Sequence, residues 1–593
     1  MNITDYNPEN ILRLEKTDPG QAQELWQSLS PEQRLKGILS ANTPREQTRL
    51  ILLAQDSKEL VQALSSDNFA RLVMDIGPAD CLEIVELSSD EQLTYLLDLT
   101  AWRREELDPD RYGAWLPVIM EAGPLKLKVW LESVDIETLT LLGRHWFTVW
   151  KYVPSQDEQE PPDDLPEFTL DGIYWLEFNR PDEAALAAQI MVVLKSELPD
   201  KYSQVMEAMR WEPDSELKEY ARRWRQGRLQ DQGFPSREEA LSLWANPGPG
   251  ESAWENKPLK YAPAGIHQES GIKAWGGFMA EDELLPSGLT CLTVSEQDNL
   301  KQELTFIANC GIVALDADWA DRKAAGRAAA ESISLVNLGL SLLAGGHESP
   351  ASDLSAARGQ RAAAILRRLP LPVIARQGAG AVRGLNKQAW KILKTGWLKD
   401  LPTGFNLLDF PLDRWLAGLL FKLPRFYNQS GSPEYRAFHN ISELQQAQNA
   451  LARIDFWGKL IFELAGLNRL EVLKTLTAPG WPEDPLDRKL SHLLFTYWVR
   501  QALKLPGLAP LKLHDLSRAV RIMKKKPAGS WRDQAGQSAG LLAEPERGLA
   551  KSILNGLLDE LETEFKNLSS HPLADPAISA EILAGMLPLV SEK

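Results

Sequence analysis

One stretch near the middle of the chain has the composition of an anion-binding surface. Residues 354–399 hold ten lysines and arginines and no acidic residue. On a helix with about 100° per residue, three of the lysines share one face beside an apolar stripe. Guanidinium and ammonium groups bind phosphates, and indole rings stack on bases. The candidate anion-binding residues are Arg367, Arg368, Arg376, Arg383, Lys387, Lys391, Lys394, Trp390 and Trp397.

A second basic stretch, 500–532, ends in a lysine triplet at 524–526. Together, 361–399 and 500–532 predict a surface for nucleic acid, a phosphorylated ligand or an anionic membrane face. Two alternatives stay open: a solvated face, or a face that docks on the acidic N-terminal half. Residues 1–260 hold 27 basic and 47 acidic residues, which gives this part a net charge of −20. The whole chain of 593 residues has a net charge of −17, so the acidic excess lies in the N-terminal half.

Asp316 and Asp318 have the spacing of a phosphoryl-transfer motif, because they follow the apolar run GIVAL. In haloacid-dehalogenase-type phosphatases, such a pair ends a strand; one carboxylate attacks phosphorus and the other acts as acid or base beside Mg²⁺. Here no partner motif follows in a strand–helix alternation. We therefore expect a helix cap with solvated acids, and whether the two aspartates line a pocket stays open.

Gly378, Gly380 and Gly384 imitate a dinucleotide-binding fingerprint, but the third glycine is one place late and Arg383 stands where glycine is required. We expect a loop or a helix terminus here. No phosphate-binding G-x-x-x-x-G-K-[ST] motif occurs. No two of the seven histidines are four residues apart, and none is close to a cysteine, so the spacing typical of metal ligands does not occur. The sequence therefore predicts no metal site, no cofactor and no catalytic set.

Cys81, Cys291 and Cys310 are few and far apart, which argues against disulfides and predicts small buried side chains. The first 14 residues carry charges and lack the apolar core of a signal peptide. The longest charge-free apolar run, 332–346, is shorter than the about 20 residues that span a bilayer. These features predict a cytoplasmic protein without a transmembrane segment.

The first 150 residues contain repeated helix-start signals. Ser30–Gln33, Thr43–Glu46 and Ser89–Gln92 are capping boxes, in which a hydroxyl and a distal side chain bond to free backbone N–H groups. Further starts are expected near 66, 78, 108 and 124. Helices this short bury their apolar faces only by stacking, so we predict a superhelical helical-repeat array.

The segments DIGPADCLEIVEL and LSSDEQLTYLLDL resemble the intracellular N-terminal helical domain of MgtE-type magnesium transporters and, more distantly, the flagellar motor switch protein FliG. The resemblance covers residues 45–150. It implies a divalent-ion-responsive regulator in which surface acids sense Mg²⁺. The acids to test are Asp67, Asp80, Asp90 and Glu91.

Breaks in composition predict further domains. Residues 154–167 are rich in proline and acid, and FTLDGIYWLEF at 168–178 has the composition of a short strand or hairpin. The predicted division is a helical-repeat domain 1–153, a linker 154–167, a helical domain 168–245, a linker 246–265, a helical block 266–345, a basic helical domain 358–523 and a flexible segment with a C-terminal amphipathic helix 524–593. The fold class is mainly α.

The order of the MgtE-like array, the acidic linker, FTLDGIYWLEF, FPSREEAL and LPSGLTCL resembles a large bacterial family known only as a domain of unknown function. This resemblance implies an all-helical chain and no activity.

We therefore expect a non-catalytic helical scaffold or protein-interaction module, with another protein as its partner and an undetermined oligomeric state. The alternatives are anion or nucleic-acid binding and divalent-ion regulation. The 20 tryptophans are expected to be wedges between short helices, apart from Trp390 and Trp397.

Overall fold

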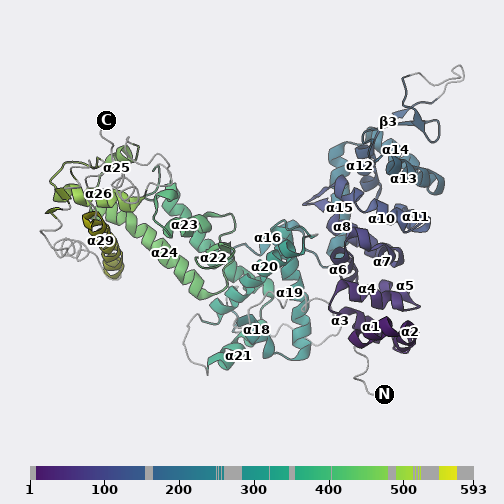
Figure 1. Cartoon of the computed structure of the whole chain (residues 1–593), viewed down its shortest axis with the longest axis horizontal. Helices are drawn as coiled ribbons and strands as arrows, with labels where there is room; N and C mark the ends of the chain where they lie inside the picture. Colours follow the sequence, from purple (N-terminus) through teal and green to yellow (C-terminus); the bar gives the residue numbers. More distant parts are fainter. Residues whose placement is uncertain are drawn as a thin grey trace. The chain divides into compact units, whose positions relative to one another are not determined.

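The computed structural model describes residues 8–153, 164–248, 250, 253–255, 257–258, 284–319, 321–345, 354–401, 404–477, 489–509, 511, 515, 518–519, 521–522 and 546–570. The described chain is mainly helical, as predicted, with a few short antiparallel strand pairs (Figure 1). By its contacts it divides into unit 1, residues 1–241 and 308–329, and unit 2, residues 242–307 and 330–593. The finer division predicted from the linkers stays a prediction.

Unit 1 begins with short helices, of which those near 30, 43, 66, 78 and 89 start where the capping signals predict, whereas the starts at Pro8, Pro19, Ser57 and Leu82 were not predicted. They are α1 (Pro8–Thr17), α2 (Pro19–Gln27), α3 (Pro31–Ser40), α4 (Pro44–Leu53), α5 (Ser57–Ala63), α6 (Ser66–Ile76), η2 (Pro78–Asp80), α7 (Leu82–Leu87) and α8 (Asp90–Thr100). The capping boxes of α3, α4 and α8 are all formed, with both reciprocal hydrogen bonds present. The start signals are thus confirmed, whereas the repeat architecture stays a prediction.

The second part of unit 1 contains a hairpin, a small sheet and longer helices. Its elements are β1 (Trp102–Arg103), β2 (Glu106–Leu107), α9 (Pro109–Gly113), α10 (Leu116–Glu121), α11 (Pro124–Ser133), α12 (Ile136–Trp146), β3 (Phe147–Lys151), β4 (Phe168–Thr169), β5 (Tyr174–Phe178), α13 (Ala184–Glu197), α14 (Pro199–Trp211), α15 (Asp214–Asp231) and α16 (Arg237–Ser242). The predicted hairpin at 168–178 is confirmed as β4 and β5.

The sheet has the antiparallel order β3–β5–β4, and its first strand was not predicted. Phe147 pairs with Phe178 and Lys151 with Tyr174, so residues on both sides of the acidic stretch at 154–167 share one sheet. β3 lies against α12 and α14 (Figure 1). The missed strand follows α12 without a break, where no turn residue marks the change.

The middle of the chain supplies four helices, α18 (Leu284–Thr290), α19 (Val294–Ala314), α20 (Arg322–Leu343) and α21 (Leu354–Leu366). Residues 308–314 of α19 and 322–329 of α20 belong to unit 1. There Arg322 forms an ion pair with Asp75 over 2.6 Å. The rings of Trp319 and Phe234 meet edge to face with centroids 4.9 Å apart. These contacts hold residues 308–329 against the N-terminal part of unit 1.

The remaining elements of unit 2 surround one apolar core. They are α22 (Leu371–Lys394), η4 (Gly404–Leu407), α23 (Leu412–Leu420), β6 (Phe426–Tyr427), β7 (Tyr435–Arg436), α24 (Ile441–Lys459), a π-helical turn η5 (Leu460–Leu464), α25 (Arg469–Leu476), α26 (Leu490–Ala502) and α29 (Glu546–Ser570). The predicted amphipathic helix is α29, in which Ile553, Leu554, Leu557 and Leu558 are buried. Among the described residues, no helix has the length and hydropathy of a membrane-spanning segment.

The glycines at 378–384 correct one expectation. They lie inside α22 and form neither a loop nor a helix terminus. A Cβ on Gly378 would lie 2.4 Å from the carbonyl oxygen of Leu335, and one on Gly339 would lie 1.9 Å from that of Ile374. The backbones of α20 and α22 therefore touch, and glycine is present because no side chain fits. The dinucleotide-fingerprint interpretation is wrong.

The tryptophans and cysteines follow their predicted roles in part. Trp26, Trp130 and Trp146 are among the largest fully buried side chains. Trp211 and Trp224 are instead 71% and 54% exposed, so the prediction of core wedges is wrong for them. The thiols of Cys81 and Cys310 are buried, and burial raises their pKa to about 11 and about 12. Cys291 is only partly buried.

Candidate ligand-binding pockets

Unit 1 contains a pocket of about 1080 Å³, here called the arginine pocket. Its walls come from the β1–β2 hairpin, from α15, from residues 234–241 and from residues 312–319 at and beyond the end of α19. Six arginines line it: Arg103, Arg104, Arg111, Arg222, Arg225 and Arg237. The β1–β2 hairpin, α9, α15 and residues 234–241 thus place six guanidinium groups around one cavity.

The α15 wall is fixed by an ion pair between half-buried Arg228 and buried Asp98. Arg228 donates to both carboxylate oxygens of Asp98 in α8, over 2.7 and 2.8 Å, and the Asp98 side chain is only 5% exposed. Burial by itself would lower the pKa of Arg228, but the bonds to Asp98 outweigh it and raise that pKa. The pair therefore sets the position of α15, including Arg225 one helical turn earlier.

Arg225 is the distinctive cation of the pocket. Its Nε donates to the backbone oxygen of Asp98 over 2.7 Å, and Nη1 donates to the backbone oxygen of Arg104 over 3.2 Å. The guanidinium lies 4.9 Å from the centroid of the Trp102 ring. Burial lowers the pKa of Arg225 to about 10, so it stays charged at neutral pH. Asp98 and Glu105 attract its charge, but it forms no ion pair with any carboxylate in the described part of the chain.

The lining also includes the two aspartates of the Asp-x-Asp motif, Asp316 and Asp318. Arg237 binds both carboxylate oxygens of Asp316, and Arg111 donates to Asp318 over 2.7 Å. The hydrogen bond to Asp316 raises the pKa of Arg237, and the bond to Asp318 raises that of Arg111. The two aspartates therefore line a pocket and are held in ion pairs.

The motif stands where a helix ends, as expected, with Asp316 exposed and Asp318 half-buried. It follows α19, and Asp316 has a left-handed φ of 52°. The phosphatase chemistry needs the pair at the end of a strand, with carboxylates free to attack phosphorus and bind Mg²⁺. Neither condition holds, so the phosphatase interpretation is excluded.

The charges of the arginine pocket are unequally matched. Arg103 pairs with Asp108, Arg222 with Glu219, and two further arginines pair with the aspartates. Arg104 and Arg225 form no ion pair with a described carboxylate, although Glu105, Glu238 and Glu239 also line the cavity. The aromatic rings of Trp102, Phe234 and Trp319 line the same cavity. The arrangement suits a ligand with an anionic group and a flat or apolar body.

Unit 2 contains a smaller pocket of about 330 Å³, here called the basic pocket. Four cations line it: Arg383, Lys387, Lys422 and Arg425. Glu331 is the one acid in its lining and already forms an ion pair with Arg425. Arg383 and Lys387 are two of the residues predicted to bind anions. The acid-free basic stretch at 354–399 thus contributes two of the four cations of the basic pocket.

The other predicted anion-binding residues lie elsewhere. Arg367 forms an ion pair with Glu296 over 2.7 Å, and Arg368 donates to the backbone oxygen of Ala364 over 3.1 Å. Arg376 is half-buried inside α22. Lys391 and Lys394 are exposed on α22, outside the lining of the basic pocket. This part of the predicted surface is dispersed.

The two singled-out tryptophans do not share a helix face, because α22 ends at Lys394. Trp390 is 36% exposed and lies under Lys394, whose Nζ is 4.3 Å from the ring centroid. Trp397 packs against the core, so closely that a Cβ on Gly458 would lie 2.3 Å from its ring. A stacking platform built from both rings is therefore excluded.

The second basic stretch is only partly described. Arg500 donates to the backbone oxygens of Gly507 and Ala509 over 2.8 and 3.1 Å, which gives it a structural role. Arg518 lies 3.6 Å from Asp515. The lysine triplet at 524–526 lies outside the described residues.

The ion pair of Arg367 gives a prediction about pH. The hydrogen bond from Arg367 lowers the pKa of Glu296 from 4.5 to about 2. A lowered folded-state pKa stabilises the fold above the unfolded pKa, and this stabilisation is lost as the pH falls from 4.5 towards 2. We expect the melting temperature of Arg367→Gln to fall less steeply over this range than that of the wild type. Parallel curves would contradict this assignment.

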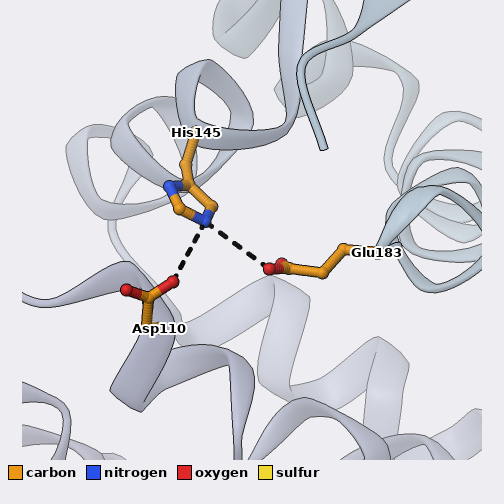
Figure 2. A group of neighbouring side chains, drawn as sticks. All are labelled: Asp110, His145 and Glu183. Atoms are coloured by element: carbon orange, nitrogen blue, oxygen red, sulfur yellow. Dashed lines mark ion pairs between the residues drawn. The ribbon is translucent and has the colours of Figure 1, made fainter. Parts of the chain in front are cut away.

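The sequence predicted no metal site, but three potential ligands converge in unit 1 (Figure 2). His145 Nε2 lies 3.7 Å from Asp110 Oδ1 and 3.7 Å from Glu183 Oε1. Arg180 already donates to Asp110 over 2.8 Å, and the Trp146 indole donates to Glu183 over 2.8 Å. Because each carboxylate has a partner, we assign the cluster to holding α9, α12 and the start of α13 together.

The acids suggested by the magnesium-transporter resemblance do not form such a cluster within the described chain. Asp67 forms an ion pair with Arg71 over 2.6 Å, while Asp90 and Glu91 lie in the first turn of α8. There they interact favourably with the helix dipole. His145, Asp110 and Glu183 had no signal in the sequence, since they come from three separate helix ends.

Comparison with protein families gives a match over nearly the whole chain. Residues 23–584 match the family of unknown function DUF6178. The chain belongs to this family. No curated protein and no solved structure matches it. The DUF6178 match covers every residue that lines the arginine pocket and the basic pocket, so both lie within the family's extent.

Proposed function

We propose that this protein binds a small anionic ligand in the arginine pocket of unit 1. The observation that carries the proposal is Arg225, a charged guanidinium that lines the cavity without a carboxylate partner among the described residues. Burying an unpaired charge is costly. A carboxylate or phosphate of a ligand would form a direct ion pair with this guanidinium through paired N–H···O bonds.

The shape and lining of the pocket favour a ligand that is more than a bare ion. Small-molecule sites occupy about 300–1000 Å³ and combine apolar walls with a few polar groups. The arginine pocket is of this size, at about 1080 Å³, and Trp102, Phe234 and Trp319 supply flat apolar surface. The proposed ligand therefore joins an oxyanion to a flat or apolar body.

A screen by ligand charge tests this proposal. We expect adenosine monophosphate and benzoate to raise the melting temperature of the wild type, because a ligand that binds only the folded state stabilises it. Benzylamine, a flat cation, should have no effect. Arg104→Gln should weaken the stabilisation by the anions, since Arg104 is exposed and lines the pocket. The proposal would be refuted if benzoate and benzylamine raised the melting temperature equally. It would also be refuted if none of the compounds raised it.

The proposal is one of binding and keeps the expectation of a non-catalytic protein. Its support is that Asp316 and Asp318 are engaged by arginines and so are poor candidates for general bases. The helical scaffold that binds another protein, and a divalent-ion response of the magnesium-transporter-like region, stay predictions. No contact among the described residues favours either of these functions over ligand binding in the arginine pocket.

A further inference from the structure

The basic pocket of unit 2 differs from the arginine pocket in its charge balance. Arg383, Lys387 and Lys422 form no ion pair with any carboxylate that the structure describes. The acid of the lining, Glu331, is engaged by Arg425. Three cations thus surround one small cavity without a counter-charge, which raises the local concentration of anions.

The fold holds these cations in place from two sides. Arg383 and Lys387 are four residues apart on α22, so they lie one above the other on the same face. Asn386 donates to the backbone oxygen of Leu419 over 2.6 Å and thereby ties α22 to the end of α23. The backbone N–H of Arg425 donates to the oxygen of Gly418 over 2.9 Å. Lys422 lies between these two anchored points.

Part of the lining of the basic pocket is apolar. Leu335, Val382 and Phe438 line it, and Trp244 contributes an aromatic ring. Val382 and Phe438 are buried in the core. Low-dielectric walls strengthen the attraction between the cations and an anion inside the cavity.

We propose that the basic pocket binds the phosphate group of a phosphorylated small molecule. A phosphate has enough oxygens to accept from Arg383, Lys387 and Lys422 together, and Arg383 can supply two parallel N–H donors. The cavity of about 330 Å³ admits a small molecule. This site is independent of the arginine pocket, because all of its lining residues belong to unit 2.

The experiment is a calorimetric titration of the full chain with inorganic phosphate, pyrophosphate and a short DNA duplex. Two double variants remove the same charge from the same helix: Arg383→Gln with Lys387→Gln in the pocket, and Lys391→Gln with Lys394→Gln outside it. We expect the pocket variant to weaken pyrophosphate binding at least about tenfold, because it loses charge-assisted hydrogen bonds. The variant outside the pocket should bind within about twofold of the wild type.

Three outcomes would overturn the proposal. One is that pyrophosphate and phosphate do not bind at low salt, and another is that both double variants weaken binding equally. The third is that only DNA binds and that binding depends on Lys391 and Lys394, which would indicate a nucleic-acid surface. Arg104→Gln separates the two sites, since it alters the arginine pocket and should leave pyrophosphate binding to the basic pocket intact.

Discussion

Gly378→Ala is expected to destabilise unit 2 by about 3 kcal/mol, because the added methyl group has no space. Its Cβ would lie 2.4 Å from the carbonyl oxygen of Leu335 and 3.0 Å from the amide nitrogen of Gly339. Both contacts are with the backbone of α20, so no side chain can rotate away. Relief requires α20 and α22 to separate, which would disturb the core that packs around them.

The same helix offers a matched control. A Cβ on Gly384 meets nothing within 4 Å, so Gly384→Ala should stabilise α22 by up to about 1 kcal/mol through helix propensity. Hydrogen exchange of peptides from α20 and α22 measures the effect locally, whether or not the two units unfold together. Similar exchange in the two variants would show that the helices do not touch as described.

Asp98→Ala is expected to cost unit 1 about 3 kcal/mol. The side chain of Asp98 is 5% exposed and receives two hydrogen bonds from Arg228, whose guanidinium would lose its main counter-charge. Removing the buried partner leaves the half-buried Arg228 with only Asp135, 3.5 Å away, as a counter-charge. Because the pair also positions α15, the variant should lose ligand binding in the arginine pocket as well.

Asp214→Ala serves as the control for this second prediction. Asp214 forms an ion pair with Arg144 but is 68% exposed, so its loss should cost less than about 1 kcal/mol. Urea denaturation of both variants gives the comparison. Equal shifts in the midpoint would mean that Asp98 contributes no more than a surface acid, and the structural role of its pair would be wrong.

Local signals predicted the helix starts and one hairpin. The boxes at Ser30, Thr43 and Ser89 work because a hydroxyl and a distal side chain satisfy backbone donors within four residues. Gly378 illustrates what local sequence patterns cannot predict. A glycine in α22 is required by the backbone of α20, about forty residues away, and nothing next to it in the sequence reports that contact.

The two pockets also differ in how far local sequence could predict them. Arg383 and Lys387 stand in an acid-free run, so the composition of a single segment was enough to single them out. The arginine pocket joins residues near 104, 225, 237 and 316; Arg225 stands in the basic run ARRWRQGR at 221–228, whereas the other three lie among acids or apolar residues. Only the fold brings them together, and only the structure shows that Arg225 has no partner among the described carboxylates.

The most direct test of the account is the affinity of adenosine monophosphate for the full chain and two arginine variants of α15. Arg225→Gln removes the cation that lines the pocket, whereas Arg223→Gln removes an exposed one that pairs with Glu219 outside it. We expect at least about a tenfold loss of affinity for Arg225→Gln, with the helical circular dichroism unchanged, and less than about a twofold change for Arg223→Gln. Equal affinities of the two variants would contradict the assignment of the ligand site to Arg225.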